Sequence, residues 1–249
     1  MCTLTWQMQE GGYRLLFTRD EQRSRAPALL PQVDEKLAAV YPLDPQGQGT
    51  WIATNKQGQT WCLLNLYAEH SFESTNIRPV QTKNSRGKII LICLEQLIQS
   101  TLSDEQIKDC LQLLCESKGF TPFTLCYFPK VTEQQDYQPK YWQWNGREIS
   151  QSNLPKMFTS SGKLFSEVKN NRQAVFAHMP KVNQQDAQWA FHQSHVPLKS
   201  HLSVCMHRED AKSISITEVI VKNNLQQMSY WQSSPCKADY QQPDKLIRL

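Results

Sequence analysis

Hydrophobic and polar residues alternate from the first residues of the chain, which predicts a β-strand. Two sets of side chains take opposite faces of it, Cys2, Leu4, Trp6 and Met8 on one and Thr3, Thr5 and Gln7 on the other. Gly11 and Gly12 then give a turn signal, and the run YRLLFTR that follows is rich in strand-forming residues. The pattern predicts an antiparallel hairpin at the N-terminus.

The register of this hairpin decides which side chains meet. With Gly11 and Gly12 as the two-residue loop, Cys2 pairs with Glu21, and Arg19 lies on the face of Cys2 as its diagonal neighbour. Diagonal neighbours are roughly 7–8 Å apart, within reach of a long side chain. Asp20 points to the other face unless the strand ends there. We therefore expect a guanidinium close to the Cys2 thiol.

A second hairpin is predicted in GTWIATNKQGQTWCLLN, with residues 55–58 as its loop. Its second strand runs out at Asn65. An asparagine directly after an apolar strand is most often a turn residue. The same position also lets a carboxamide project from a sheet edge into a cleft, and both interpretations stay open.

The rest of the chain alternates between helical and strand-like patterns. SRGKIILICLEQLIQS has helical spacing, and a second helix begins at the capping box of Ser103 and Gln106 and ends at Gly119. TPFTLCYF, YWQWNGREI and MSYWQSSPC indicate strands, and HLSVCMHREDAKSISITEVIV indicates a hairpin. KLFSEVKNNRQAVFAH and DAQWAFHQSH indicate helices. Strand-rich blocks with helices between them predict a layered α+β domain.

Composition narrows the function classes. The 249 residues are 39% hydrophobic and 20% charged, enough for a sizeable core, and no apolar run approaches the ~18 residues of a membrane helix. A net charge of +4, spread along the chain, argues against a nucleic-acid partner. The N-terminus lacks the pattern of a secretion signal, and most of the eight cysteines sit in apolar segments without a C-x-x-C pair. We therefore expect buried thiols and a cytoplasmic location.

Several spaced motifs carry a family resemblance. MCTLTW, FTRDEQRSRAPA, YPLD, GTWIATNKQG and LLN occur in that order over roughly the first 66 residues. This block resembles the NRDE family, whose eukaryotic members are called Transport and Golgi Organisation protein two. The family is named for an Asn-Arg-Asp-Glu tetrapeptide, and this chain departs from it by having Thr18 before Arg19.

The NRDE family in turn resembles the N-terminal-nucleophile hydrolases that use an N-terminal cysteine. The resemblance implies one domain over residues 1–249, a four-layer αββα sandwich of two antiparallel sheets. It implies Cys2 as nucleophile, Arg19 as the arginine on the second strand and Asn65 as an oxyanion donor. The acidic partner is Asp20 or Glu21, which the alignment does not separate. Two further polar positions have loose candidates, Asn153 or Ser160 for one and Arg208 for the other.

The chemistry implied is hydrolysis of a carbon–nitrogen bond in a small amide or N-acyl substrate, without a cofactor. Removal of Met1 would give Cys2 a free α-amine, whose reference pKa of about 7.7–8.0 suits a general base. A thiol beside an ammonium and an arginine is expected to have a lowered pKa. The cycle would acylate Cys2 and then hydrolyse the acyl-enzyme.

A non-catalytic role is the alternative, because some eukaryotic relatives have been linked to haem handling. Such a protein would bind haem or another hydrophobic ligand in an apolar pocket. One segment, FHQSHVPLKSHLSVCMH, gathers thiol and imidazole groups suited to zinc or haem iron, namely His192, His195, His201, Cys205 and His207. Their spacing fits no zinc-finger pattern, so we expect unrelated structural histidines and no metal. The oligomeric state is left open by the sequence.

Overall fold

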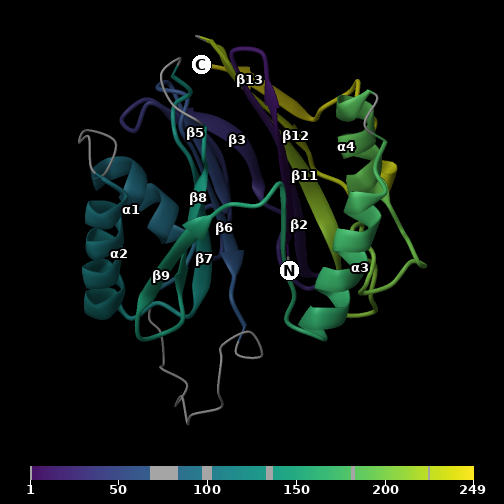
Figure 1. The fold of residues 1–249 in the computed structure, drawn as a ribbon, viewed down its shortest axis with the longest axis horizontal. Coiled ribbons are helices and arrows are strands. Elements are labelled where there is room, and N and C mark those ends of the chain that lie inside the picture. The colour runs from purple at the N-terminus through teal and green to yellow at the C-terminus, as the bar shows by residue number, and fades with distance from the viewer. Residues whose placement is uncertain (1, 68–83, 97–102, 133–136, 181–182, 224) are drawn as a thin grey trace. The chain divides into compact units, whose positions relative to one another are not determined.

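The computed structural model describes residues 2–67, 84–96, 103–132, 137–180, 183–223 and 225–249. The chain divides into two compact units, one formed by residues 1–26 and 155–249 and the other by residues 27–154. Among the described residues, each unit contains one antiparallel sheet and two α-helices (Figure 1). The predicted α+β class and the two antiparallel sheets are confirmed, while the single domain over residues 1–249 stays a prediction.

The first unit holds a six-stranded sheet in the order β10-β1-β2-β11-β12-β13. The strands are β1 (Cys2–Gln9), β2 (Gly12–Gln22), β10 (Met157–Ser160), β11 (Ala211–Lys222), β12 (Leu225–Trp231) and β13 (Lys245–Arg248). Helices α3 (Phe165–Ala177) and α4 (Gln184–Gln193) pack on it, α3 against β10 and α4 against β2. A 3₁₀ helix, η2 (Pro235–Lys237), follows β12.

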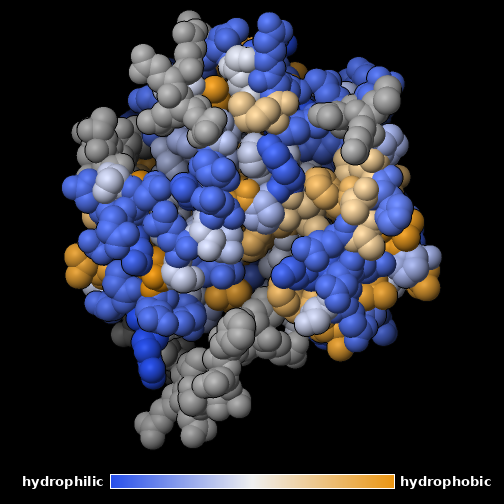
Figure 2. Space-filling view, in the orientation of Figure 1, coloured by the Kyte–Doolittle hydropathy of each residue, from blue (hydrophilic) through white to orange (hydrophobic). Residues whose placement is uncertain are grey.

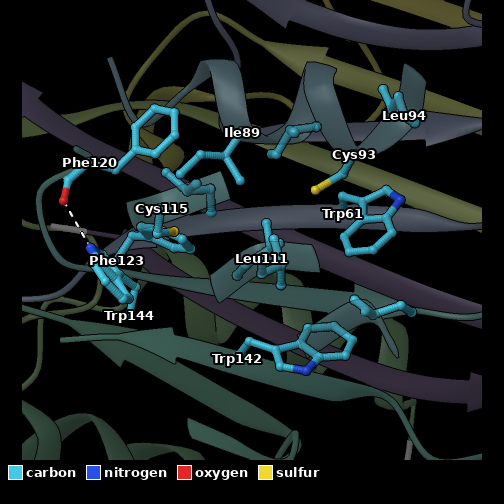
Figure 3. Packing of buried hydrophobic residues seen from close by; sticks show 14 of the residues in the cluster. Trp61, Ile89, Cys93, Leu94, Leu111, Cys115, Phe120, Phe123, Trp142 and Trp144 are labelled. Carbon is cyan, nitrogen blue, oxygen red and sulfur yellow. Dashed lines mark hydrogen bonds between the residues drawn. The ribbon is translucent and has the colours of Figure 1, made fainter. Parts of the chain in front are cut away.

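The second unit holds a seven-stranded sheet in simple chain order from β3 to β9. Its strands are β3 (Leu29–Asp34), β4 (Ala39–Leu43), β5 (Ile52–Asn55), β6 (Thr60–Asn65), β7 (Phe123–Phe128), β8 (Lys140–Trp144) and β9 (Ile149–Asn153). Helix α1 (Lys88–Gln96) packs against β6, and α2 (Asp104–Lys118) packs against β8 and β9. Their apolar sides meet the sheet in a core that includes Trp61, Ile89, Leu111 and Trp142 (Figure 3).

The N-terminal hairpin forms, but its predicted register is wrong by two residues. Cys2 pairs with Arg19, and Gln9 pairs with Gly12, so the loop is Glu10-Gly11. Gly11 takes the positive φ of 71° that the turn needs. Gly12 belongs to the strand instead. Only glycine fits there, because a Cβ would lie 1.7 Å from the Val221 carbonyl oxygen of the neighbouring β11. A shift of two residues keeps every side chain on its predicted face.

The capping box at the start of α2 is confirmed, with Ser103 and Gln106 bonded to each other's backbone N–H groups. Gly119 ends α2 in the left-handed conformation, as the sequence predicts. The hairpin expected over residues 201–221 is wrong in its first half, where only His207 makes an isolated bridge, to Lys212. Residues 97–100 of the first predicted helix lie outside the described residues.

Polar residues cover most of the molecular face in view in Figure 2. Among the residues that the structure describes, no helix is both long and apolar enough to cross a membrane.

Candidate active site around Cys2

Cys2 begins β1 between two other strands of the six-stranded sheet. It pairs with Arg19 on β2 and with Ser160 on β10. Its backbone N–H donates to Ser160 Oγ over 3.2 Å. Ser160, one of two loose candidates for a further polar position, is therefore brought to the nucleophile candidate. The residue Cys2 is half-buried, at the end of a strand whose next four residues are buried.

Arg19 lies directly across from Cys2 rather than diagonally. Side chains of directly paired residues share a face, and their Cβ atoms lie about 4.5–5.5 Å apart. The Arg19 side chain is 6% exposed, and its Nη2 donates to Glu21 Oε2 over 3.3 Å. Glu21 also pairs with Arg25 at 3.6 Å. Glu21 thus serves as the carboxylate partner of two arginines.

Asp20 occupies the opposite face of β2, as the alternation predicts, and is fully buried at its side chain. Its Oδ1 accepts a 2.6 Å hydrogen bond from Ser213 Oγ, and its Oδ2 lies 3.8 Å from Arg172 Nη2. Burial raises the pKa of the Asp20 carboxyl, although Arg172 and Ser213 act in the other direction. Of the two acidic candidates, Asp20 is the buried one and its charge acts on the Cys2 thiol.

In this chain, which begins with Met1, the pKa of the Cys2 thiol lies above its ordinary value, so the lowered pKa expected beside a free α-amine stays a prediction. Burial raises its pKa, and the charge of Asp20 adds to that effect. The positive charge of the chain N-terminus is the strongest influence in the opposite direction, followed by a hydrogen bond from the Asp20 backbone and the Arg19 charge. Desolvation wins because a thiolate loses more in leaving water than these charges and the hydrogen bond return. A raised pKa disfavours the thiolate, so a nucleophilic role for Cys2 calls for a base.

Arg172 on α3 is the residue that the sequence analysis missed. Fully buried, it donates from Nη1 to Thr3 Oγ1 at 2.5 Å and to Thr159 Oγ1 at 2.9 Å, and from Nη2 to the Ser203 carbonyl at 2.8 Å. It thereby joins β1 and β10, next to the Cys2–Ser160 pair, to the loop after α4. The signal was available, since Arg172 follows the buried Val168 by four residues on one helix face.

The remaining candidates take other positions. Asn65 ends β6 in the second unit, where its Nδ2 donates to Tyr67 Oη over 3.2 Å. Asn153 ends β9 in the same unit and accepts from Lys140 Nζ. Arg208 lies in the first unit and pairs with Asp210. Its charge reaches Asp20 and helps to lower the pKa of that carboxyl.

The cysteines differ from the expectation in one respect. Cys62, Cys93, Cys115, Cys126 and Cys205 are buried, as predicted, but Cys110 is exposed on α2 and Cys236 is half-buried. Cys110 lies on the outer side of α2, away from the buried positions Ile107, Leu111 and Cys115. All eight cysteines are free thiols.

Of the thiol and imidazole groups, His192 on α4 is buried against the six-stranded sheet. Its ring nitrogens contact Thr5 Oγ1 at 2.8 Å and Thr18 Oγ1 at 2.7 Å. His195, Cys205 and His207 come together, and Cys236 joins them from η2. Within the described part of the chain, these four side chains form a group suited to hold a metal ion.

Comparison with known proteins places the chain in a family. No curated protein matches it. The fold is similar to two solved structures, both variants of a conjugated bile acid hydrolase from Clostridium perfringens. Their sequences are 11% and 13% identical to this chain, each with a TM-score of 0.49, and each match covers 100% of this chain and 92% of the hydrolase chain. A third, an N-acylethanolamine-hydrolyzing acid amidase ortholog from Caenorhabditis elegans, has 9% identity, a TM-score of 0.48 and full coverage of both chains. The family model described as Transport and Golgi organisation 2 matches residues 1–234, so the chain belongs to that family.

Proposed function

We propose that this chain is an N-terminal-cysteine hydrolase that cleaves the carbon–nitrogen bond of a small amide or N-acyl substrate through an acyl-enzyme on Cys2. The observation that carries the proposal is the hydrogen bond from the Cys2 backbone nitrogen to Ser160 Oγ. When Met1 is removed, that nitrogen becomes the α-amine of Cys2. The amine would then start from an ordered strand end, with Arg19 paired opposite.

Because burial raises the pKa of the Cys2 thiol, the proposed cycle needs a general base. In the proposed cycle the α-amine takes the thiol proton while Sγ bonds to the substrate carbonyl carbon. The same proton then passes to the leaving amine as the carbon–nitrogen bond breaks. Water, activated by the α-amine, next attacks the thioester, releasing the carboxylic acid and restoring the thiol. The amine's reference pKa of about 7.7–8.0 suits both directions of transfer.

The other residues take supporting roles in this proposal. Arg19 would favour negative charge on the sulfur, since its charge lowers the thiol pKa. Asp20 acts as a positioning residue, because its side chain ties β2 to Ser213 on β11 and to Arg172. Asn65, at the end of β6, is proposed as the oxyanion donor by its family position alone.

The test begins with the intact mass of the purified chain, which should show Met1 removed. A panel of N-acyl amides is then assayed with wild type, Cys2→Ala and Asn65→Ala. We expect no turnover from Cys2→Ala and a loss of about 10²–10³ in kcat for Asn65→Ala, typical of a missing oxyanion donor. Cys110→Ser is the matched control, since Cys110 is exposed on α2. Retention of Met1, or turnover by Cys2→Ala, would contradict the proposal.

One observation favours the second candidate, binding of haem or another hydrophobic ligand without catalysis. A cavity of about 390 Å³ on β3 and β4 is lined by both apolar and polar side chains, with Leu29, Leu30 and Val33 among the apolar ones. These three are 36–48% exposed, which is unusual for grouped apolar residues unless they bind something. Haemin or a fluorescent apolar probe that binds wild type and Cys2→Ala alike, but binds Leu29→Asp poorly, would favour this role. The free thiols support a cytoplasmic location for either function.

A further inference from the structure

Four metal-binding side chains meet in the first unit, three of them within 13 residues and the fourth 29 residues further along the chain. The ligand atoms of His195, Cys205, His207 and Cys236 all lie within 4.8 Å of one another. His195 follows α4 by two residues, Cys205 and His207 lie in the long connection to β11, and Cys236 is the middle residue of η2. Only folding brings the C-terminal cysteine to the other three, which explains why no zinc-finger spacing appears in the sequence.

The two separations between His207 and the cysteines match those of a tetrahedral zinc site, and the whole group would close from within 4.8 Å around an ion. Zn–S bonds of about 2.3 Å and Zn–N bonds of about 2.0–2.1 Å at the tetrahedral angle place sulfur and nitrogen about 3.6 Å apart. His207 Nε2 lies 3.5 Å from Cys205 Sγ and 3.5 Å from Cys236 Sγ. The rings of His195 and His207 are edge to face, with centroids 5.2 Å apart. The two imidazole rings therefore do not stack on each other.

The donor set and its surroundings also suit zinc. Two cysteines and two histidines are a common set for structural Zn²⁺. His195 Nε2 is shielded from solvent and has no hydrogen-bond partner among the described residues, so the ring offers a free nitrogen. Zn²⁺ with two thiolates and two neutral imidazoles carries no net charge. It is therefore compatible with Lys199 and Arg23, whose charges reach His207.

We propose that His195, Cys205, His207 and Cys236 bind one Zn²⁺ ion in a closed structural site. Four protein ligands leave no coordination position for water, so the ion holds the fold and does not act on a substrate. It ties the connection between α4 and β11 to η2. That connection, residues 194–210, contains no helix or strand, and connections longer than about 12–15 residues without secondary structure are uncommon in compact domains.

The zinc site is joined to the surroundings of Cys2 by a short hydrogen-bond chain. Met206, which lies between two ligands, donates its N–H to Ser213 Oγ over 2.8 Å, and Ser213 Oγ donates to Asp20. Ser234, two residues before the ligand Cys236, donates to the Ser213 carbonyl. Both segments that bind zinc thus converge on Ser213. Zinc would fix the segment against which Asp20 is held, whatever reaction Cys2 performs.

Metal content of the full-length chain, purified with reductant and without chelator, tests the proposal. Elemental analysis should give one zinc per chain for wild type. Cys236→Ser and His207→Ala should lower zinc affinity by more than the 10–100-fold typical of losing an outer-shell partner. His201→Ala is the matched control, because His201 lies in the same connection but outside the four ligands. Zinc content that is unchanged in Cys236→Ser would overturn the assignment.

A cobalt readout separates loss of a ligand from loss of folding. Wild-type protein freed of zinc and loaded with Co²⁺ should show the strong visible bands of tetrahedral cobalt and thiolate-to-cobalt charge transfer. The control His201→Ala should give the same spectrum, and Cys205→Ser should lose part of the charge-transfer intensity. If wild type binds no zinc and gives no thiolate–cobalt bands, or if it carries iron instead of zinc, the proposal is wrong. The same holds if Cys205 and Cys236 form a disulfide that zinc does not prevent.

Discussion

Two helices cover one face of the sheet in each unit, yet the two units bury different kinds of side chain beneath them. In the second unit, α1 and α2 meet the sheet through aromatic and aliphatic residues, with Trp61 stacked on Tyr127 and close to Trp142. In the first unit, much of the space beneath α3 and α4 holds buried polar groups, among them Arg14, Arg172, His192, Glu218, Gln188, Thr5 and Thr18.

The difference shows that the same architecture can be stabilised in two ways. An apolar interface gains free energy from removing surface from water and tolerates small rearrangements. A buried polar network must satisfy every group, because one missing partner leaves a desolvated charge or dipole. The network includes Arg172 and Asp20, which lie beside the proposed nucleophile. We infer that the first unit gives up part of an apolar core to hold its strand ends in one arrangement.

Breaking the ion pair between Arg14 and Glu218 should have the largest effect. Arg14 Nε and Glu218 Oε1 are 2.6 Å apart, and both side chains are almost fully buried. Arg14→Met leaves the Glu218 carboxylate without its charge partner, so we expect the free energy of unfolding to fall by about 3–5 kcal/mol. Urea denaturation followed by tryptophan fluorescence measures it.

The double variant Arg14→Met/Glu218→Met sharpens this test. Replacing both members of a buried ion pair by apolar residues is often neutral or stabilising. We therefore expect the double variant to recover most of the loss. If the single variant is as stable as wild type, the polar network is not the fragile element that we describe.

An apolar truncation in the second unit gives the matching measurement. Leu111 on α2 is 1% exposed in the apolar core. Leu111→Ala should cost about 3 kcal/mol, from lost burial and the cavity left behind. Leu113→Ala on the same helix is the control, because Leu113 is 67% exposed. Equal losses from both variants would show that the helix, and not the core beneath it, is what the substitution weakens.

Acid should weaken the first unit through His192. Burial lowers the pKa of His192 to about 3, and the charges of Arg14 and Arg172 add to the effect. The unfolded chain has a histidine pKa near 6.5, so between these values it binds more protons than the folded chain. Stability from this residue is complete above about pH 6.5 and falls with acid by up to about 1.4 kcal/mol per pH unit.

The difference between wild type and His192→Gln isolates this contribution. Asp20 works in the opposite direction, because its raised pKa favours the folded state at low pH. Denaturation at several pH values between 4 and 7 should show a shallower slope for His192→Gln than for wild type. His178→Gln serves as the control, since His178 is exposed at the end of α3. Parallel slopes for all three proteins would exclude His192 as the source.

The smallest effect is expected at the cap of α2. Ser103 and Gln106 form a complete capping box there, whereas α3 and α4 have no side-chain cap. Ser103→Ala should cost about 1 kcal/mol, or roughly 2–4 °C in melting temperature for a chain of this size. Ser103→Asp keeps the acceptor and should remain close to wild type. A loss that is the same in both variants would mean that the cap bond contributes little.

Local patterns were enough to predict much of this molecule. The alternation from Cys2 onward assigns Arg19 to the face of Cys2 and Asp20 to the other face, and the pairing of β1 with β2 confirms both. The α2 cap and its glycine stop follow from chemistry within one helical turn. Short-range rules succeed here because each depends on residues that are neighbours in the sequence.

Other features depended on segments that are distant in sequence. Gly12 belongs to a strand and not to the hairpin loop, and β11 approaches it too closely for any side chain. Alternation showed that Thr3 and Thr5 share a face but not that α3 and α4 cover it, so their burial was not predictable from β1 alone. The raised pKa of the Cys2 thiol follows from its burial, and the charged residues close to Cys2 in the sequence do not reveal that burial.

The sequence by itself determined the family, the α+β class and the faces of the first hairpin, because motif order and periodicity are properties of the chain. Tertiary structure alone decided that Arg172 reaches Thr3 and Thr159, and that Cys236 joins His195, Cys205 and His207. Cys236 and His207 are separated by 29 positions in the sequence, and Arg172 and Thr3 by 169 positions. No local rule fixes such a contact, since it depends on how whole strands and helices pack.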